Sequence, residues 1–244
     1  MKRLGILAMV LTWLLCSTAA WADFYVIAGS GPPVGTKITS VPYTISTPGF
    51  YYFNRNLNYG GSGGTAITIS ADDVTLDLMG FSLTNSATGF SHGILMDGRT
   101  NVEIRNGTVR DFDYGIYEAS SSGSKHSAIN VRLTGNSYGI YFNGSNHLIK
   151  GCNGSNNLHL SLFIDSGLIT NCVACNNSLG IVMHGPGNLL ANTAFNNSVH
   201  NFDLGNGVAT AIMADRNSAF GLATNYYVEP GTTGVQWGIN AGSP

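Results

Sequence analysis

The chain has 244 residues, of which 43% are apolar and only 10% are Asp, Glu, Lys or Arg, so it can bury a sizeable core and does not have the composition of a disordered protein. Its 32 glycines and few charges argue against a helical protein, because glycine is costly inside helices and helix surfaces carry many charged side chains. A formal net charge of −2 without a run of Lys or Arg excludes the electrostatic signature of a nucleic-acid-binding protein.

The segment 1–22 has the pattern of an export signal. Lys2 and Arg3 form a basic start, the segment 4–15 is apolar, and an Ala-Trp-Ala cleavage motif ends at Ala22. We therefore predict cleavage after Ala22 and a secreted or periplasmic protein. A lipoprotein anchored through Cys16 is the alternative, and no membrane span is expected because the apolar run is too short to cross a bilayer as a helix.

The mature chain is expected to form one domain with atypical ends. Residues 23–60 contain several prolines and the aromatic run at 50–53, which suits an N-terminal cap. Residues 61–208 contain internal repeats, described below. Residues 209–244 are expected to close the other end as a C-terminal cap or to fold back along the side as a tail.

A short strand unit recurs between the two ends. Gly-Ile pairs and their replacements begin the successive units at Gly93, Gly115, Gly139, Ser161, Gly180 and Asn201. The steps between these starts are nearly constant, and small insertions account for their differences. A repeat of about 22 residues with so little helix-forming composition is typical of a solenoid.

The composition of each unit indicates short strands joined by tight bends. Alternation such as Ile94/Met96 and Ile140/Phe142 predicts that one face of the first strand points inward. A second apolar run follows in each unit, and Asn residues come after it. Because Asn and Gly tolerate the left-handed backbone and stacked Asn amides can hydrogen-bond to one another, the units predict an all-β parallel solenoid with an amide ladder.

Four sequence motifs resemble those of a known family. These are PYTI at 42–45, PGFYY at 48–52, DDVTLDL at 72–78 and NGTV at 106–109. They resemble the secreted bacterial right-handed parallel β-helix repeat proteins, a superfamily that includes pectate lyases and the carbohydrate-binding and sugar-hydrolase repeat domains, and the likeness covers about residues 36–205. The resemblance implies a right-handed parallel β-helix and, for many members, a role with polysaccharides, although the fold also carries epimerases and adhesins.

Outward side chains at equivalent positions should form columns spaced by about 4.8 Å per coil. One column contains Tyr117, Tyr141 and Phe163. Such a stripe would bind the apolar faces of sugar rings. The alternative is a stacking ladder that stabilises neighbouring coils, or a surface covered by the C-terminal tail.

A second expected column is cationic. It contains Arg105, Arg132 and Lys150, preceded by Asp77. Three neighbouring cations would favour the carboxylate of a uronate as a ligand, and some lyases of the resembled family use Lys and Arg next to such a group. Ordinary solvated cations are the alternative, and no run matches the arginine and calcium-aspartate motifs of the pectate lyases.

Three residues are candidates for catalysis. Asp165 and His184 fall at equivalent places in neighbouring units, so the carboxylate would orient the imidazole as a general base. Glu118 stands where an inward apolar residue is expected, and it is either a general acid with a raised pKa or the end of a strand that has turned outward. The Asp-rich motifs of the β-helix polygalacturonases are absent.

Cysteine positions suggest structure more than chemistry. Cys152 and Cys172 occupy equivalent places in adjacent units, which is compatible with a disulfide in an oxidising compartment. Inward stacking of both, together with Cys175, as small apolar residues is the alternative. Neither the Asp pair at 72–73 nor the pair around Phe112 supplies enough ligands for Ca²⁺, so no metal and no cofactor is expected.

The sequence as a whole predicts an exported protein whose side presents a surface to an extracellular polysaccharide, without catalysis. A polysaccharide lyase or glycoside hydrolase that acts on an acidic glycan is one alternative. A structural or adhesive surface protein is the other.

Overall fold

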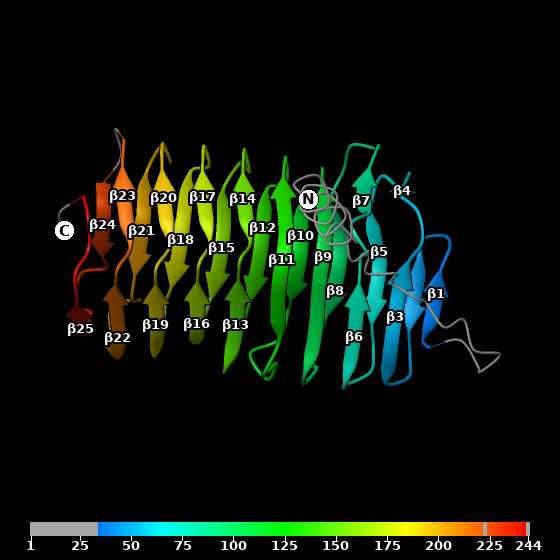
Figure 1. Ribbon diagram of the computed structural model, residues 1–244, viewed down its shortest axis with the longest axis horizontal. Helices are drawn as coiled ribbons and strands as arrows, with labels where there is room; N and C mark the ends of the chain where they lie inside the picture. Colours follow the sequence, from blue (N-terminus) through cyan, green and yellow to red (C-terminus); the bar gives the residue numbers. More distant parts are fainter. Residues whose placement is uncertain (1–33, 222–223, 243–244) are drawn as a thin grey trace, which may run out of the picture. The chain divides into compact units, whose positions relative to one another are not determined.

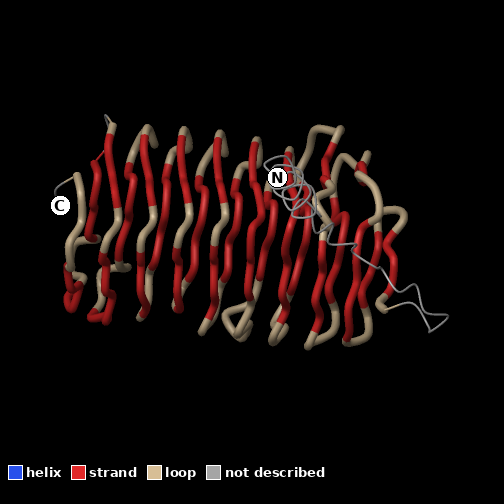
Figure 2. The backbone as a smooth tube through the Cα atoms, viewed as in Figure 1, coloured by secondary structure: helices blue, strands red, loops and turns tan. Residues whose placement is uncertain are grey.

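A computed structural model describes residues 34–221 and 224–242, so the predicted export signal lies outside the described residues. The described chain is all-β, and about eight turns of parallel strands stack into a β-solenoid (Figures 1 and 2). This confirms the predicted fold class. Within the same residues, the structure has no helix long and apolar enough to cross a membrane.

Two sheets form the long sides of the solenoid, and we call them the narrow and the wide sheet. The narrow sheet has nine strands, in the order β2 (Tyr43–Ile45), β5 (Gly64–Ile69), β8 (Ser91–Met96), β10 (Tyr114–Glu118), β12 (Tyr138–Phe142), β15 (Leu160–Ile164), β18 (Leu179–Met183), β21 (His200–Leu204) and β24 (Thr224–Val228). The main path of the 16-stranded wide sheet runs through β1 (Thr36–Ile38), β3 (Gly49–Phe53), β6 (Val74–Asp77), β9 (Val102–Arg110), β11 (Ser127–Thr134), β13 (His147–Lys150), β16 (Gly167–Thr170), β19 (Gly187–Leu190), β22 (Ala209–Asp215) and β25 (Thr233–Trp237). Six further strands continue the wide sheet beyond a bend: β4 (Leu57–Tyr59), β7 (Ser82–Asn85), β14 (Asn153–Ser155), β17 (Val173–Cys175), β20 (Thr193–Phe195) and β23 (Ser218–Phe220).

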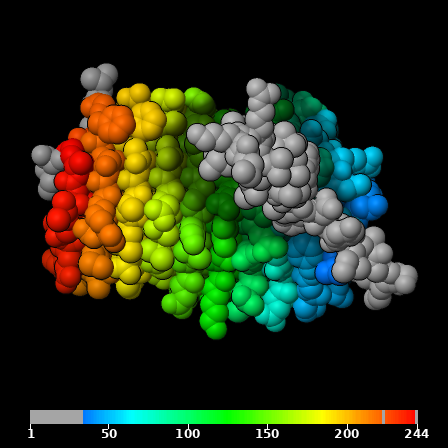
Figure 3. Space-filling model, viewed as in Figure 1, coloured from blue at the N-terminus to red at the C-terminus, as the bar shows by residue number. Residues whose placement is uncertain are grey.

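The strand register follows the repeat seen in the sequence. Ile94, Ile116 and Ile140 are successive partners in the narrow sheet, and coils follow one another in chain order along the stack (Figure 3). The coil length is roughly 24 residues, slightly longer than expected. The coils differ in length, since the step from Ile67 to its register partner Ile94 exceeds the step from Ile94 to Ile116.

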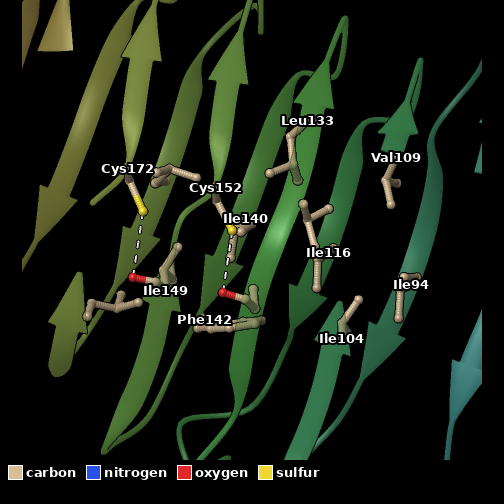
Figure 4. Packing of buried hydrophobic residues seen from close by; sticks show 14 of the residues in the cluster. Ile94, Ile104, Val109, Ile116, Leu133, Ile140, Phe142, Ile149, Cys152 and Cys172 are labelled. Carbon is tan, nitrogen blue, oxygen red and sulfur yellow. Dashed lines mark hydrogen bonds between the residues drawn. The ribbon is translucent and has the colours of Figure 1, made fainter. Parts of the chain in front are cut away.

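The core lies between the two sheets. Ile94, Ile116 and Ile140 of the narrow sheet and Ile104 and Ile149 of the wide sheet are all fully buried, and their side chains point into the space between the sheets (Figure 4). The alternation expected for the first strand of each unit is confirmed, because its inward residues are buried in every coil where it was predicted. Burying each such side chain is worth about 1.5–3 kcal/mol.

Asparagines at the bends have two separate roles. One set adopts a left-handed backbone with φ between 54° and 57°: Asn156, Asn176 and Asn196. The other set is buried, and each member donates its amide to a further asparagine at 2.8–3.1 Å: Asn136, Asn157, Asn177, Asn197 and Asn201. All these bonds join neighbouring coils except the one from Asn197 to Asn201, which lies within one coil. The predicted amide ladder is therefore present, and the left-handed bends lie beside it.

The two ends of the described chain join the same sheets. Strands β1 to β4 precede Gly60, and β22 to β25 follow Val208, yet each pairs in parallel with its neighbouring coil. Tyr226 in β24 is buried and stacks on Phe202 at a centroid distance of 5.0 Å. The end segments thus contribute strands to the stack, and their boundaries and role as caps stay predictions.

Candidate functional site

The predicted aromatic column lies on the outer face of the narrow sheet. Tyr117 pairs in register with Tyr141, and Tyr141 pairs with Phe163. Their ring centroids are 5.8 Å and 4.2 Å apart, respectively. Val182 and Asp203 continue the column in the next two coils, so the alignment expected from the sequence is confirmed.

A second aromatic column, which the sequence analysis missed, runs beside the first. His92, Tyr114 and Tyr138 are successive register partners and precede the first column in their strands. Gly115 and Ile116 are both buried, so the residues on either side of this pair face outward. The repeated tetrapeptide Tyr-Gly-Ile-Tyr at 114–117 and 138–141 carried this signal. The columns together form a surface that we call the aromatic face.

Ring stacking decides what the aromatic face offers to a ligand. The Tyr114 ring lies 4.2 Å from that of Tyr117 and 4.6 Å from that of Tyr138, with interplanar angles of 23° and 10°. Rings stacked in this way cover one another's faces, so they present edges and hydroxyl groups. Burial and the neighbouring tyrosines raise the pKa of Tyr114 to about 12, so its hydroxyl keeps its proton and remains a donor at neutral pH.

Phe163 does not belong to the exposed part of this face. It is 2% exposed and forms a small apolar cluster with Leu160 and Val182, separate from the core. The ring of Tyr141 stacks on it, and the His184 ring meets it edge to face at 4.8 Å. The prediction of an exposed stripe of three rings is therefore wrong at Phe163. The other two members, Tyr117 and Tyr141, are partly exposed.

The predicted cationic column is not assembled. Arg105 pairs in register with Ile129, and Ile129 pairs with Lys150, whereas Arg132 pairs with Thr108. In the structure, the buried Ala128 is the register partner of Ile104. The expected column instead required Val131 to be the partner of Ile104. The small side chain of Ala128 gave no apolar signal, which is why the expected alignment was displaced along the strand.

Arg105 is neutralised within the protein. Its Nε donates to Asp77 at 2.8 Å, and its Nη1 donates to Glu103 at 2.7 Å. The hydrogen bond with Asp77 raises the pKa of Arg105 further, despite some burial. Lys150 is exposed, and no ion pair of its ammonium is found in the described part of the chain.

Glu118 points into the solenoid and is fully buried. Its carboxylate accepts the backbone N–H groups of Gly98 and Ser120, both at 2.7 Å, and lies 3.0 Å from Nε2 of His126. Burial alone would raise the pKa of Glu118, but these hydrogen bonds together lower it. The alternative that Glu118 lies at a strand end that has turned outward is therefore wrong. The prediction that the pKa of Glu118 is raised is wrong as well.

A buried chain of histidines continues from Glu118. Nδ1 of His126 accepts the backbone N–H of Val102 at 3.3 Å, which assigns the ring proton to Nε2 and thus to the bond with Glu118. Nδ1 of His147 accepts the N–H of His126 at 3.2 Å, and its Nε2 donates to the carbonyl of Asn143 at 2.9 Å. Burial, with the neighbouring His126, lowers the pKa of His147 to about 4. We call Glu118, His126 and His147 the buried acid–imidazole network.

Asp165 and His184 lie in adjacent coils without forming the expected pair. Asp165 instead accepts the backbone N–H of Gly144 at 2.9 Å, and no hydrogen bond joins these two described side chains. The arrangement expected of them occurs at His200 and Asp203, where Nδ1 and Oδ2 are 2.9 Å apart. Burial raises the pKa of Asp203 in spite of His200, and the His200 ring stacks on Tyr227 at 4.1 Å.

Cys152 and Cys172 lie on neighbouring coils with their side chains in the core (Figure 4). Both are free thiols, and they donate to the carbonyls of Ala128 and Thr170 at 3.4 Å and 3.3 Å. Cys175 is only half-buried, so inward stacking holds for two of the three cysteines. The backbone N–H of Cys172 also donates to Asn192, the first member of a second amide ladder.

No known protein family matches the chain, and no curated protein matches it. In residues 34–221 and 224–242, no group of three or more His, Cys, Asp or Glu side chains has the arrangement of a metal site.

Proposed function

We propose that the protein is exported and binds an extended extracellular polysaccharide along the aromatic face, without cleaving it. The observation that carries this proposal is the double column of outward rings, with Tyr114, Tyr117, Tyr138 and Tyr141 at its centre. A surface that repeats with each coil, about every 4.8 Å, suits a ligand that itself repeats. Phenol groups combine apolar contact with hydrogen bonding, which suits a sugar.

Two further features support this proposal. Phe90 is 62% exposed at the edge of the aromatic face and contacts the rings of His92 and Tyr114, so it extends the contact surface into solvent. The resemblance to β-helix repeat proteins of the pectate-lyase-like superfamily favours the same class of ligand.

Binding is favoured over cleavage by the position of the acidic candidates. Glycoside hydrolysis normally uses two carboxyl groups on either side of the scissile bond. Glu118 is fully buried in the interior, so it is out of reach of a polymer bound outside. Asp165 is held by the backbone of Gly144.

Polysaccharide cleavage is the second candidate, and one observation favours it. His200 and Asp203 lie on the outer face of the narrow sheet, beyond Phe163 toward the C-terminal end of the stack, with the carboxylate oriented toward the imidazole. This is the arrangement of a general base held by an acid. Its ligand would occupy the same face.

The test uses the mature chain, beginning at Asp23, and a panel of immobilised glycans. We expect retention of the protein on at least one glycan, with no new reducing or unsaturated ends. Phe90→Ser and Tyr117→Ser should each weaken retention at least about 10-fold, the equivalent of about 1.4 kcal/mol. New ends that disappear in His200→Gln would establish the enzyme instead.

Phe220→Ser is the matched control. Phe220 is 52% exposed and stacks on Phe195 at 4.9 Å, but it lies in β23 of the wide sheet. Its loss should leave glycan retention unchanged. Equal weakening by Phe220→Ser and Tyr117→Ser, or no retention on any glycan, would contradict binding at the aromatic face. The export signal is checked separately, by finding Asp23 at the N-terminus of protein recovered outside the cytoplasm.

A further inference from the structure

Two tyrosines of neighbouring coils have nearly parallel rings. Tyr114 in β10 and Tyr138 in β12 are register partners. Their ring centroids are 4.6 Å apart, and the ring planes differ by only 10°. Because adjacent strands are about 4.8 Å apart and both side chains start from equivalent backbone positions, equivalent atoms of the two rings lie opposite one another. The Cε atoms, next to the carbon that carries the hydroxyl group, therefore face each other.

The other tyrosines nearby are not aligned in this way. Tyr117 also stacks on Tyr114, at 4.2 Å and 23°. These two residues are three apart in one strand, so their Cα atoms are about 10 Å apart and their side chains lean toward one another instead of running side by side. The ring of Tyr141 meets those of its three tyrosine neighbours edge to face, at 80°, 81° and 85°. In the described part of the chain, parallel phenol rings thus join two coils only at Tyr114 and Tyr138.

The position of this pair makes it accessible to an oxidant in solvent. Tyr114 and Tyr138 are both partly exposed on the outer face of the narrow sheet. The thiols of Cys152 and Cys172 are more readily oxidised side chains, but both are buried in the core. A small one-electron oxidant that reaches the aromatic face therefore meets phenol groups first.

We propose that Tyr114 and Tyr138 are a site of oxidative cross-linking, where a peroxidase with hydrogen peroxide joins the two rings by a Cε–Cε bond. Each phenol loses one electron to the oxidant and one proton to solvent, which leaves two phenoxyl radicals. The radicals couple at Cε, and each Cε then gives up its proton while a proton returns to the phenolic oxygen. The two electrons and two protons released overall reduce one hydrogen peroxide to two water molecules. The product is a dityrosine that lacks two hydrogen atoms.

The cross-link would tie two coils of the solenoid together covalently. It closes the chain between residues 114 and 138 into a loop, which restricts the unfolded chain as a disulfide does. The cross-linked protein should therefore resist unfolding better than the untreated protein. This modification goes beyond the function proposed above and requires no glycan.

Peptide mapping tests the site on the complete mature chain. The protein is treated with a haem peroxidase and hydrogen peroxide, and the monomer is isolated under denaturing conditions and digested with trypsin. Because trypsin cleaves after Lys and Arg, Tyr114 and Tyr138 fall in the separate peptides 111–125 and 133–150. We expect mass spectrometry to find these two peptides joined, with two hydrogen atoms fewer than their sum. The urea midpoint of the cross-linked monomer should be higher than that of the untreated protein.

Two double variants of identical composition are compared. Tyr114→Phe/Tyr138→Phe removes the parallel phenols, whereas Tyr117→Phe/Tyr141→Phe removes the other phenol from each of the same two peptides. Both keep all four rings for packing, and their unfolding midpoints before treatment show that each is folded. The joined peptides should be at least about 10-fold more abundant in the second variant than in the first, because coupling depends on how the two radicals are held together.

Four outcomes would overturn the proposal. These are equal yields of the joined peptides in the two double variants, a cross-link confined to peptide 111–125, no joined peptides in the unaltered monomer, or a urea midpoint that cross-linking leaves unchanged. A cross-link within peptide 111–125 would show that Tyr114 couples to Tyr117 instead. The readout does not involve glycan retention, so failure here is distinct from failure of glycan binding at the aromatic face.

Discussion

Gly154 and Ser161 compensate for each other in size. Gly154 occupies an inward position of the wide sheet, between Leu133 and Ala174 in the adjacent coils. Ser161 stands where a neighbouring coil of the narrow sheet has Gly139. A Cβ on Gly154 would lie 1.8 Å from Oγ of Ser161. The missing side chain at one position therefore makes room for the additional one at the other.

We expect Gly154→Ala to destabilise the protein by about 1–3 kcal/mol, because the core has no room for the new methyl group. Adding Ser161→Gly should recover most of this loss, since the pair then resembles Ala174 and Gly180 of the next coil. Urea unfolding of the two single variants and the double variant measures the coupling. Equal destabilisation of Gly154→Ala with and without the second change would show that the two sites do not interact.

At the scale of the element, the amide ladder ties successive coils together through buried side chains. Asn177 accepts the backbone N–H of Asn157 at 2.9 Å and donates its amide to Asn197, also at 2.9 Å. It also donates to the carbonyl of Gly154. Asn176 is next to it in sequence but exposed, with a left-handed backbone. Neighbouring asparagines thus serve different physical purposes.

We expect Asn177→Ala to lower the free energy of unfolding by about 2–4 kcal/mol, because it leaves buried backbone and amide groups of two coils without partners. Asn176→Gly is the matched control, and it should change stability by less than about 0.5 kcal/mol, since glycine adopts the same backbone without a Cβ. Chemical unfolding of both variants provides the comparison. Similar losses at the two positions would contradict a special role for the ladder.

At the scale of the whole molecule, the buried acid–imidazole network makes stability depend on pH. Nδ1 of His147 accepts a backbone N–H, so a protonated ring cannot keep that bond. Its pKa is about 4 in the folded protein, against 6.5 for a free histidine. Between these values the unfolded chain binds more protons than the folded one, so the stability is fully present above pH 6.5 and is lost as the pH falls toward 4. Glu118, whose pKa is lowered, adds to the loss at still lower pH.

We expect the free energy of unfolding to fall by about 3 kcal/mol between pH 7 and pH 4 on account of His147. His147→Gln, which keeps an acceptor and a donor, should flatten this part of the profile. His159→Gln is the control, because His159 is exposed and its loss should leave the profile as it is. Urea midpoints at several pH values give the measurement. If the free energy of unfolding of His147→Gln falls with pH as steeply as that of the unaltered protein, His147 is not the group responsible.

The local sequence pattern was sufficient to predict the fold and part of the aromatic face. The regular spacing of the Gly-Ile units brought Ile116 and Ile140 into register, and with them Tyr117 and Tyr141. Such features are visible in a sequence because each coil repeats the same inward and outward choices. The asparagines at the bends were visible for the same reason, since bends and ladder return once per coil.

Residues that break the repeat needed the three-dimensional structure. Ala128 is too small to be recognised in the sequence as an inward residue. The predicted register of its strand was therefore shifted, and Arg132 was placed beside Arg105 instead of Thr108. Glu118 appeared to be a misplaced carboxylate, and only the contacts with Gly98, His126 and Ser120 explain its burial. The physical reasons differ. The periodic pattern reports large apolar side chains, so it misses a small inward residue such as Ala128. The burial of Glu118 depends on hydrogen bonds to particular groups, including the backbone N–H of Gly98 in the neighbouring coil, and such bonds leave no period in the sequence.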